Sequence, residues 1–350
     1  MKVLLISPLP PPSGGIARWT ERYIKWCKNK HQVLVVNTAL MGNRAGEAGI
    51  NRNLLEEIRR AQYIIDATKK QLKKNPDIVH LNTSCSKFGI IRDWICVKIA
   101  IKRGVPIFVH CHCNIEDQLG TGLISNILFK DIVRKAKKVL VLNEKSKIFV
   151  SKIVNKLDKV IICPNFIELE QILTRREDNE KIERVIYVGD VRKSKGSDDL
   201  YKLADRLPNI KFILVGSVTE EMKTIEKPDN INLLGRIDAF KVREQLQNAD
   251  IFIFPSLTEG FSNAMLEAMS VGLPIIATNV GANQDMIEDK GGMIVSVHDI
   301  EGMQIALQKM KTKSVRQEMS DWNLKKVIEN YEYNCVLEKI FQIYEENMYE

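Results

Sequence analysis

The sequence predicts an α/β protein built from two doubly wound domains in series. Three observations support this prediction. The chain has 350 residues, more than one ordinary α/β domain needs. Short β-branched runs alternate with longer amphipathic stretches, as in parallel sheets whose crossover helices cover both faces. The alternation stops at a polar segment near the middle of the chain and then begins again.

The first half contains six predicted strands and five predicted helices. The strands are the short apolar runs 2–7, 32–37, 77–81, 106–112, 138–142 and 160–163. The helices are the longer periodic stretches 15–29, 51–74, 90–102, 123–135 and 144–155. This order predicts the first doubly wound domain, which we place at residues 1–168.

The polar segment 173–183 carries many charges and few large apolar residues, and we expect it to link the domains. The later strands are predicted at 184–188, 210–215, 231–233, 251–254, 274–277 and 292–295. The later helices are predicted at 197–205, 239–248, 263–270, 283–288 and 300–311, followed by a helical tail over 314–347. We place the second domain at 169–328 and expect a ligand cleft between the domains, at the carboxyl ends of both sheets.

The composition is that of a globular protein in a reducing compartment. Hydrophobic residues make up 45% of the chain, and no run approaches the roughly 18 apolar residues that span a bilayer. The seven cysteines are odd in number and lie mostly inside apolar runs, which favours free thiols. The N-terminus is typical of a short buried strand rather than a signal peptide, so we expect a cytoplasmic address.

The net charge of +8 is unevenly distributed. Residues 1–165 hold 29 Lys and Arg against 12 Asp and Glu, a net +17, whereas the remainder carries −9. A basic half with no spanning helix suggests a surface that meets membrane lipid, nucleic acid or another polyanion. A solvated basic face without a partner would show the same charge. Because no motif that reads nucleic acid accompanies the charge, no nucleic-acid partner is expected.

The strongest chemical signal follows the fourth predicted strand of the second half. Glu259 and Gly260 lie in the loop after that strand, and Ser262 is a suitable N-cap for a helix that begins near Asn263. The start of a helix offers N–H groups and a positive dipole end to a pyrophosphate. Glu267 is close enough to the start of that helix to reach a ribose. Glu259 is close enough to reach a group attached to the pyrophosphate. On spacing alone, an incidental loop glutamate and a surface helical glutamate explain the pattern equally well.

The string EGFSNAMLEAMSVGLPIIAT, residues 259–278, closely resembles the E-x7-E region of glycosyltransferase family 4, whose members are retaining enzymes with the GT-B fold. The glycine and proline at 272 and 274 and the turn 280–282 stand where the family has them. The resemblance implies two Rossmann-like domains that face a central cleft. It also implies a final helix, 329–350, that crosses back to pack on the first domain.

Two further loops resemble the family's donor site. Gly14 and Gly15 follow the first strand, where two glycines let a backbone approach the donor phosphates. Lys195 matches the family lysine that contacts the donor diphosphate. The usual place of the family arginine holds Asp190, and Arg192, two residues later, is the candidate substitute.

Other resemblances complete the implied donor site. Gly235 and Arg236 resemble the loop that packs on the nucleotide base, and Asn165 resembles the family's hinge. The implied donor-binding residues are Gly14, Gly15, Arg192, Lys195, Gly235, Arg236, Glu259, Gly260, Phe261, Ser262, Asn263 and Glu267. A nicotinamide dehydrogenase is disfavoured, because neither first strand is followed by Gly-x-Gly-x-x-Gly.

His110 and His112 alternate with Cys111 and Cys113 at a predicted strand end. Alternation places the histidines on one face and the cysteines on the other. With no second cluster expected nearby, a zinc site is disfavoured and no metal is predicted. In the family, a histidine at the end of this strand lies near the donor sugar. His112 is the better match, and His110 is expected to be a packed histidine.

The implied catalytic residues are Glu259, His112 and Lys195. The resemblance implies a retaining, metal-independent hexosyltransferase that uses a nucleotide-diphosphate sugar, with a UDP-sugar preferred, and no other cofactor. The implied acceptor is a saccharide or lipid-linked saccharide in cell-surface polysaccharide biosynthesis. Because no glycosidase-type pair of carboxylates is evident, we predict front-face departure of the diphosphate, which itself helps to deprotonate the acceptor. A UDP-sugar 2-epimerase on the same fold and a catalytically silent nucleotide-sugar-binding partner remain alternatives.

The basic first domain is expected to bind the acceptor. Arg18, Arg22 and Lys25 recur at helical spacing after the two glycines. We expect this face to meet the acceptor or an anionic membrane surface, which would make the protein peripheral on the inner face of the cell membrane.

Overall fold

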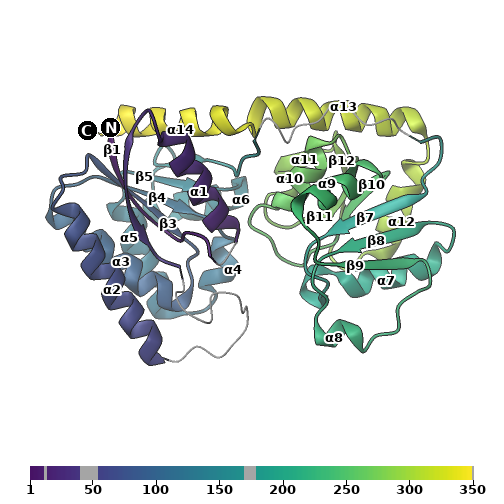
Figure 1. Ribbon diagram of the computed structural model, residues 1–350, viewed down its shortest axis with the longest axis horizontal. Helices are drawn as coiled ribbons and strands as arrows, with labels where there is room; N and C mark the ends of the chain where they lie inside the picture. The colour runs from purple at the N-terminus through teal and green to yellow at the C-terminus, as the bar shows by residue number, and fades with distance from the viewer. Residues whose placement is uncertain (12–13, 40–53, 169–178, 349–350) are drawn as a thin grey trace. The chain divides into compact units, whose positions relative to one another are not determined.

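The computed structural model describes residues 1–11, 14–39, 54–168 and 179–348. The chain divides into two compact units. Unit 1 comprises Met1–Asn165 and Asn334–Glu350, and unit 2 comprises Phe166–Tyr333. Each unit is a parallel sheet covered by helices (Figure 1). The prediction of two doubly wound α/β domains is therefore confirmed.

Unit 1 contains a six-stranded sheet in the order β2-β1-β3-β4-β5-β6, with every pairing parallel. Its strands are β1 (Lys2–Ser7), β2 (Gln32–Asn37), β3 (Ile78–Thr83), β4 (Ile107–Cys111), β5 (Lys138–Val141) and β6 (Val160–Ile162). Every residue of β3 and β4 is buried, as expected for strands covered on both faces. The strand order reverses between β1 and β3, and doubly wound sheets bind ligands at such a point.

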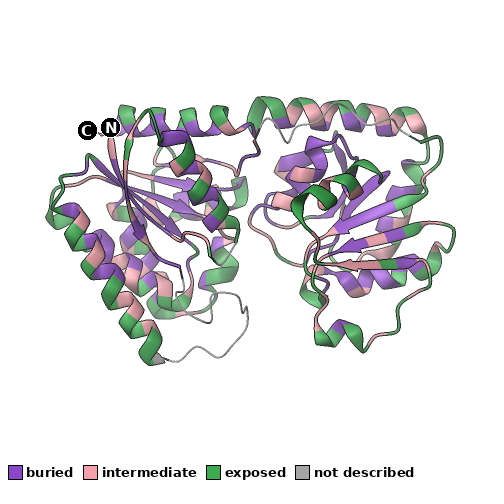
Figure 2. Cartoon of the chain, in the orientation of Figure 1, coloured by how far each residue is buried: buried purple, intermediate pink, exposed green. Residues whose placement is uncertain are grey.

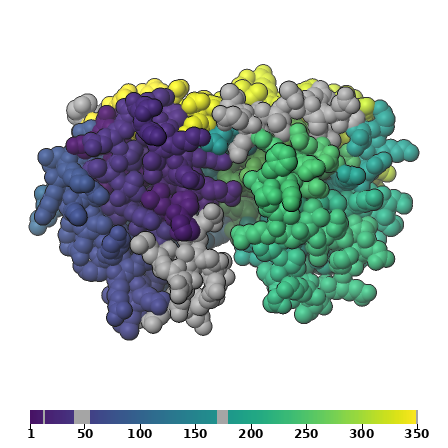
Figure 3. Space-filling view, viewed as in Figure 1, coloured from purple at the N-terminus to yellow at the C-terminus, as the bar shows by residue number. Residues whose placement is uncertain are grey.

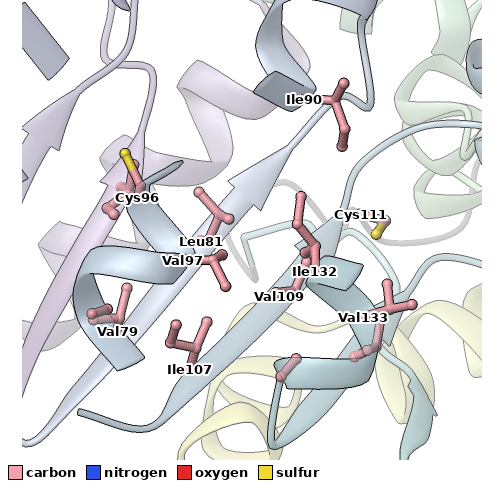
Figure 4. Packing of buried hydrophobic residues seen from close by; sticks show 14 of the residues in the cluster. Val79, Leu81, Ile90, Cys96, Val97, Ile107, Val109, Cys111, Ile132 and Val133 are labelled. Atoms are coloured by element: carbon pink, nitrogen blue, oxygen red, sulfur yellow. The ribbon is translucent and has the colours of Figure 1, made fainter. Parts of the chain in front are cut away.

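Helices cover both faces of this sheet. They are α1 (Gly15–Cys27), α2 (Leu54–Leu72), α3 (Lys87–Lys102), α4 (Ile115–Leu119), α5 (Leu123–Lys135), α6 (Glu144–Val154) and α14 (Tyr333–Asn347). On one face, Val79 of β3, Val97 of α3 and Ile132 of α5 belong to a single apolar cluster (Figure 4). On the other face, Tyr344 of α14 packs edge-on against Phe108 of β4, with ring centroids 4.9 Å apart. The C-terminal helix is therefore part of the core of unit 1.

Unit 2 contains a second parallel sheet in the order β12-β11-β10-β7-β8-β9. Its strands are β7 (Arg184–Val188), β8 (Lys211–Val215), β9 (Ile231–Gly235), β10 (Ile251–Phe254), β11 (Ile275–Thr278) and β12 (Gly292–Val295). Its helices are α7 (Ser197–Arg206), α8 (Glu220–Lys223), α9 (Ala239–Gln247), α10 (Asn263–Ser270), α11 (Asn283–Ile287), α12 (Ile300–Lys309) and α13 (Lys313–Asn330). The strand order reverses between β7 and β10, so the loops after these two strands lie where a ligand is expected.

The burial pattern explains why most strands could be predicted. The strands of both sheets are largely buried, and the exposed residues lie mainly on the outer faces of the helices (Figure 2). The last helix, α14, still presents one side to solvent, and its yellow atoms are visible at the surface (Figure 3). In the described part of the chain, no helix combines the length and the apolar character needed to cross a membrane.

Three elements differ from the prediction. The short helices α4 and α8, of five and four residues, were not expected. The predicted tail is two helices, α13 and α14, rather than one continuous segment.

The border between the units lies ahead of the predicted linker 173–183. Phe166 already belongs to unit 2, and the N–H of Ile167 donates to the carbonyl oxygen of Tyr331 at 2.9 Å. The N–H of Tyr333 donates to the carbonyl oxygen of Ile167, also at 2.9 Å. These backbone hydrogen bonds join the two ends of the unit 2 segment, and the chain returns to unit 1 at residue 334 rather than 329. Of the predicted linker, residues 173–178 lie outside the described residues.

Candidate active site

The loops that follow β7 and β10 pack tightly against each other. Gly196 has a φ of +71°, and a Cβ there would lie 2.1 Å from the carbonyl oxygen of Pro255. The N–H of Leu257 donates to the carbonyl oxygen of Ser194 at 3.2 Å. Only glycine tolerates both this backbone conformation and this contact. Gly196 thereby allows Lys195 to lie beside the loop after β10.

Lys195 and Glu259 form an ion pair across these two loops. The Lys195 ammonium contacts Glu259 Oε1, and the two side chains are 20% and 14% exposed. The Ser256 hydroxyl lies 3.4 Å from the same Glu259 oxygen and 3.0 Å from the carbonyl oxygen of Thr258. Lys195 Nζ also stands 5.9 Å from the ring centroid of Phe254. Two residues that were predicted to contact different parts of the donor are thus in direct contact.

The helix α10 begins at the end of the Glu259 loop. Ser262 caps it as predicted, because its Oγ accepts the N–H of Met265 at 3.1 Å. Asn263 is the first helical residue, so the N–H groups of the first turn point toward the loop edge that carries Glu259. Glu267 lies in the second turn and is half-buried.

The rest of this loop is held from two sides. Phe261 is buried, and its ring packs edge-on against Tyr331 with centroids 5.6 Å apart. The carbonyl oxygen of Gly260 accepts the N–H of Ala282 at 3.1 Å. The packing of Phe261 against Tyr331 therefore supports the polar part of the loop.

Arg192 is exposed on the loop that carries Lys195. Burial, and then the charges of Glu259 and Asp190, raise the pKa of Tyr187, and the charge of Arg192 acts in the opposite direction. The Tyr187 hydroxyl donates to the carbonyl oxygen of Asp190 at 2.9 Å. Arg192 and Glu259 therefore act on the same tyrosine, which places the arginine at the same loop cluster.

Gly235 and Arg236 lie further along the same sheet edge. Gly235 ends β9 with a φ of +66°, and its carbonyl oxygen accepts the N–H of Gly216 at 2.9 Å. Arg236 is exposed. Because β8 separates β9 from β7, these two residues lie two strands away from the loop of Lys195.

Gly14 and Gly15 stand at the start of α1 in unit 1. Gly14 is the N-cap with an extended backbone, and a Cβ there would meet nothing within 4 Å. The fold itself therefore does not require glycine at this position. Arg18 and Lys25 are exposed on α1, and Arg22 is half-buried.

His112 belongs to a group of histidines at the ends of β3 and β4. Its ring centroid lies 3.9 Å from that of His110, and its Nε2 lies 3.0 Å from Asn82 Oδ1. His80 places its Nε2 2.8 Å from the same Asn82 oxygen. Neither His80 nor Asn82 was predicted, because they join the group through pairing between strands rather than through spacing along the chain.

The environment of these rings keeps them neutral. Burial lowers the pKa of His112 to about 3, against the smaller opposing effect of a side-chain hydrogen bond with Asn165. Burial likewise lowers the pKa of His80 to about 4 and that of His110 well below its usual range. The Nε2 of His110 lies 3.2 Å from the carbonyl oxygen of Cys163, in keeping with a packed histidine. At neutral pH, His112 is therefore a neutral hydrogen-bonding group.

Polar residues beyond the predicted ones lie near these strand ends. Hydrogen bonds between thiols join Cys85 to Cys111 and Cys113, just as His80 joins the histidines. The reason is that β3 runs beside β4 and brings its own polar residues to the same edge. All described cysteines are free thiols. Over the described ranges, no group of three or more His, Cys, Asp or Glu side chains is placed to hold a metal ion.

Solved structures share the fold of this chain. The lipopolysaccharide outer core galactosyltransferase WaaB matches 99% of this chain over 100% of its own, with a TM-score of 0.76 and 18% identity. Anabaena Alr3699/HepE, solved in complex with UDP and glucose, matches 99% of each chain with a TM-score of 0.74 and 12% identity. The two doubly wound units are those of the GT-B fold.

Sequence comparison finds a family that matches part of the chain. Residues 170–327 match the family described as Glycosyl transferases group 1. The chain is 24% identical over 315 residues to the Escherichia coli UDP-Gal:alpha-D-GlcNAc-diphosphoundecaprenol alpha-1,3-galactosyltransferase. The aligned region covers 82% of this chain and 80% of the relative. These matches support glycosyl transfer as the activity of the protein, and the segment 170–327 is the part of the chain that this group describes. A 2-epimerase and a silent binding partner, the two alternatives, receive no support from these relatives.

Proposed function

We propose that the chain is a retaining, metal-independent hexosyltransferase that moves a sugar from a UDP-sugar to a saccharide or lipid-linked acceptor in cell-surface polysaccharide biosynthesis. The Escherichia coli relative is named for UDP-Gal and an undecaprenol-diphosphate acceptor, and the Anabaena structure holds UDP and glucose. The observation that carries the proposal is the contact between Lys195 and Glu259 beside the start of α10.

This arrangement suits a sugar diphosphate. The first turn of α10 supplies N–H groups and a positive dipole end to the pyrophosphate. Lys195 exchanges its contact with Glu259 for one with the diphosphate, which frees Glu259 for hydroxyls of the transferred sugar. Glu267, in the second turn of α10, reaches the ribose. Donor binding would thus replace the ion pair with two separate contacts, one from Lys195 to the diphosphate and one from Glu259 to the sugar.

The proposed chemistry needs no added co-reactant. The acceptor oxygen forms a bond to the anomeric carbon on the face from which the diphosphate departs, and the bond from that carbon to the phosphate oxygen breaks. The proton of the acceptor hydroxyl passes to an oxygen of the leaving diphosphate. Lys195 and the first turn of α10 stabilise the charge that develops on the diphosphate. His112, neutral at working pH, donates or accepts hydrogen bonds rather than removing a proton.

Unit 1 is proposed to bind the acceptor at the membrane. Leu123 and Ile124 begin α5 and are 73% and 67% exposed, and Phe88 begins α3 and is 49% exposed. Both helices follow strands whose carboxyl ends lie at the edge of His112. Exposed apolar side chains beside exposed lysines such as Lys87 suit an anionic lipid surface. The protein would then be cytoplasmic and peripheral on the inner membrane face.

Product analysis tests the proposal. The purified protein would be incubated with UDP-, GDP- or ADP-hexoses and a polyprenyl-diphosphate saccharide, with and without excess chelator. We expect transfer from a UDP-sugar at the same rate in chelator, with the anomeric configuration of the donor kept in the product. Inversion would exclude the retaining mechanism, and loss of activity in chelator would exclude metal independence. Conversion of the UDP-sugar without acceptor would instead point to an epimerase.

A further inference from the structure

A chain of hydrogen bonds connects His112 to α1 and to α14. Asn82 stands at its branch point. The Oδ1 of Asn82 lies 2.8 Å from His80 Nε2 and 3.0 Å from His112 Nε2. Its Nδ2 lies 2.9 Å from Ser7 Oγ. Asn82, His80 and Ser7 are all buried, so these contacts are made without competition from solvent.

The hydrogen bonds of Ser7 and Thr20 fix which atoms donate at one end of this network. The Thr20 hydroxyl donates to the carbonyl oxygen of Ile16 at 2.8 Å, so its one proton is committed. Ser7 Oγ lies 2.5 Å from Thr20 Oγ1, and Ser7 must therefore be the donor in that contact. Only lone pairs of Ser7 remain for Asn82. The asparagine consequently turns its amide N–H groups toward Ser7 and its carbonyl oxygen toward the two histidines.

The tyrosine end of this network agrees with that orientation. With the carbonyl oxygen of Asn82 turned toward His80, the proton of the neutral His80 ring lies on Nε2. Its Nδ1 then accepts from the Tyr344 hydroxyl, whose oxygen accepts from the Tyr23 hydroxyl at 3.4 Å.

We propose that Asn82 is a positioning residue that holds His112 as the Nε2–H tautomer and leaves its Nδ1 to accept a hydrogen bond. A carbonyl oxygen can only accept, so the proton in the 3.0 Å contact belongs to His112. With its proton on Nε2, the neutral ring of His112 leaves Nδ1 to accept a hydrogen bond. A substrate hydroxyl would be the donor there. This last step rests on the proposed function, whereas the tautomer does not.

Nitrogen NMR tests the tautomer without any substrate. The chain has five histidines, so selective 15N-histidine labelling gives few signals, and His112→Gln assigns those of His112. We expect the wild-type protein to show the Nε2–H tautomer near neutral pH and Asn82→Leu to show a mixture. Ser7→Ala removes the group that orients the amide with a smaller change of volume, and it should also mix the tautomers. The exposed His298 of unit 2 serves as the internal control.

Two NMR results would overturn the proposal. One is an Nδ1–H tautomer of His112 in the wild-type protein. The other is an unchanged His112 tautomer in both Asn82→Leu and Ser7→Ala. Because Ser7→Ala only shortens a side chain, it provides the answer if Asn82→Leu does not fold.

Kinetics separate positioning from a purely structural role. Asn82→Leu should lower kcat by roughly 10- to 100-fold while the KM for the donor stays within about twofold. Asn82→Asp keeps an accepting oxygen and should recover most of kcat at alkaline pH. Its negative charge favours protonated His112, so its activity should fall at a higher pH than that of the wild-type protein. Equal losses in both variants at every pH would contradict positioning. A wild-type protein without transferase activity would refute the proposed function and leave the NMR result standing.

Discussion

Gly281 lies directly against the backbone of Glu259. Its φ is +53°, and a Cβ at this position would stand 2.2 Å from the carbonyl oxygen of Glu259. The neighbouring Ala282 donates its N–H to the carbonyl oxygen of Gly260. The turn between β11 and α11 therefore fixes the position of the loop that carries Glu259, and a side chain at 281 would displace that loop.

Gly281→Ala is expected to lower both stability and turnover. The variant combines a left-handed backbone with a backbone clash, so we expect the free energy of unfolding to fall by roughly 2–4 kcal/mol. We also expect kcat to fall by about tenfold or more, because Glu259 moves. Gly104→Ala is the matched control, since Gly104 has a φ of +71° but nothing within 4 Å of a Cβ. It should lose only about 1 kcal/mol and keep its kcat. Equal effects of the two variants would show that the contact with Glu259 is unimportant.

Lys195→Ala is expected to weaken the binding of UDP. Removing the cation deprives the diphosphate of a charge-assisted contact, which should raise the Kd by roughly 10- to 100-fold. Lys193→Ala is the control on the same loop, because Lys193 pairs with Glu221 at 2.9 Å and both side chains are more than half exposed. Calorimetric titration with UDP measures both variants. A similar loss in Lys193→Ala would mean that the loop acts through its net charge alone.

Glu259→Ala is expected to separate binding from turnover. Without its carboxylate partner, Lys195 remains available to the diphosphate, so UDP should bind at least as tightly as to the wild-type protein. Contacts to the sugar are lost, and kcat should fall by roughly 100- to 1,000-fold. Titration with UDP and initial-rate measurements on the same preparation give both values. Weak nucleotide binding with turnover intact would reverse the assignment of Glu259.

Stability is expected to decline as the pH falls below about 6.5. His112 and His80 have pKa values of about 3 and about 4 in the folded protein, whereas an unfolded chain titrates near 6.5. Between these values the unfolded state binds protons that the folded state does not. The free energy of unfolding should therefore drop by up to about 1.4 kcal/mol per pH unit for each ring.

Urea titrations over this pH range measure the slope. His80→Gln removes one of the three buried rings with a lowered pKa and should make the slope shallower, whatever its effect on stability at neutral pH. If His80→Gln leaves the slope unchanged, the acid sensitivity comes from other groups.

Membrane binding is expected to depend on the start of α5. Leu123→Ser combined with Ile124→Ser should abolish sedimentation with anionic liposomes at low salt, because both exposed apolar side chains are lost. Leu157→Ser is the control, since Leu157 is 74% exposed but precedes β6, at the opposite edge of the sheet. A wild-type protein that stays in the supernatant at every salt concentration would remove the membrane from the proposal.

Much of the fold could be predicted because buried parallel strands are short apolar runs with clear ends. The strands at 2–7, 184–188 and 251–254 have the predicted boundaries. The border of unit 1 could not be placed in the same way. Composition marks 173–183 as polar, but the chain changes unit at Phe166, where burial against Tyr333 matters more than polarity.

The candidate site was predicted one residue at a time. Ser262 and Lys195 lie on the loops where their motifs placed them, but the contact between Lys195 and Glu259 was not predicted. That contact depends on how closely the loops after β7 and β10 approach, which Gly196 controls. Likewise, Asn82 and His80 carry no recognisable motif, and only the register of β3 beside β4 brings them to His112.

The position of α14 has a consequence for protein engineering. Because residues 334–348 complete the core of unit 1, unit 2 is an insertion within the chain of unit 1 rather than its C-terminal half. The hydrogen bonds between Ile167 and the segment Tyr331–Tyr333 hold the two ends of that insertion together. A chimera that exchanges donor preference with a relative should therefore transplant 166–333 as a cassette with two junctions. A single crossover near residue 166 would pair unit 1 with a foreign last helix and disrupt its core.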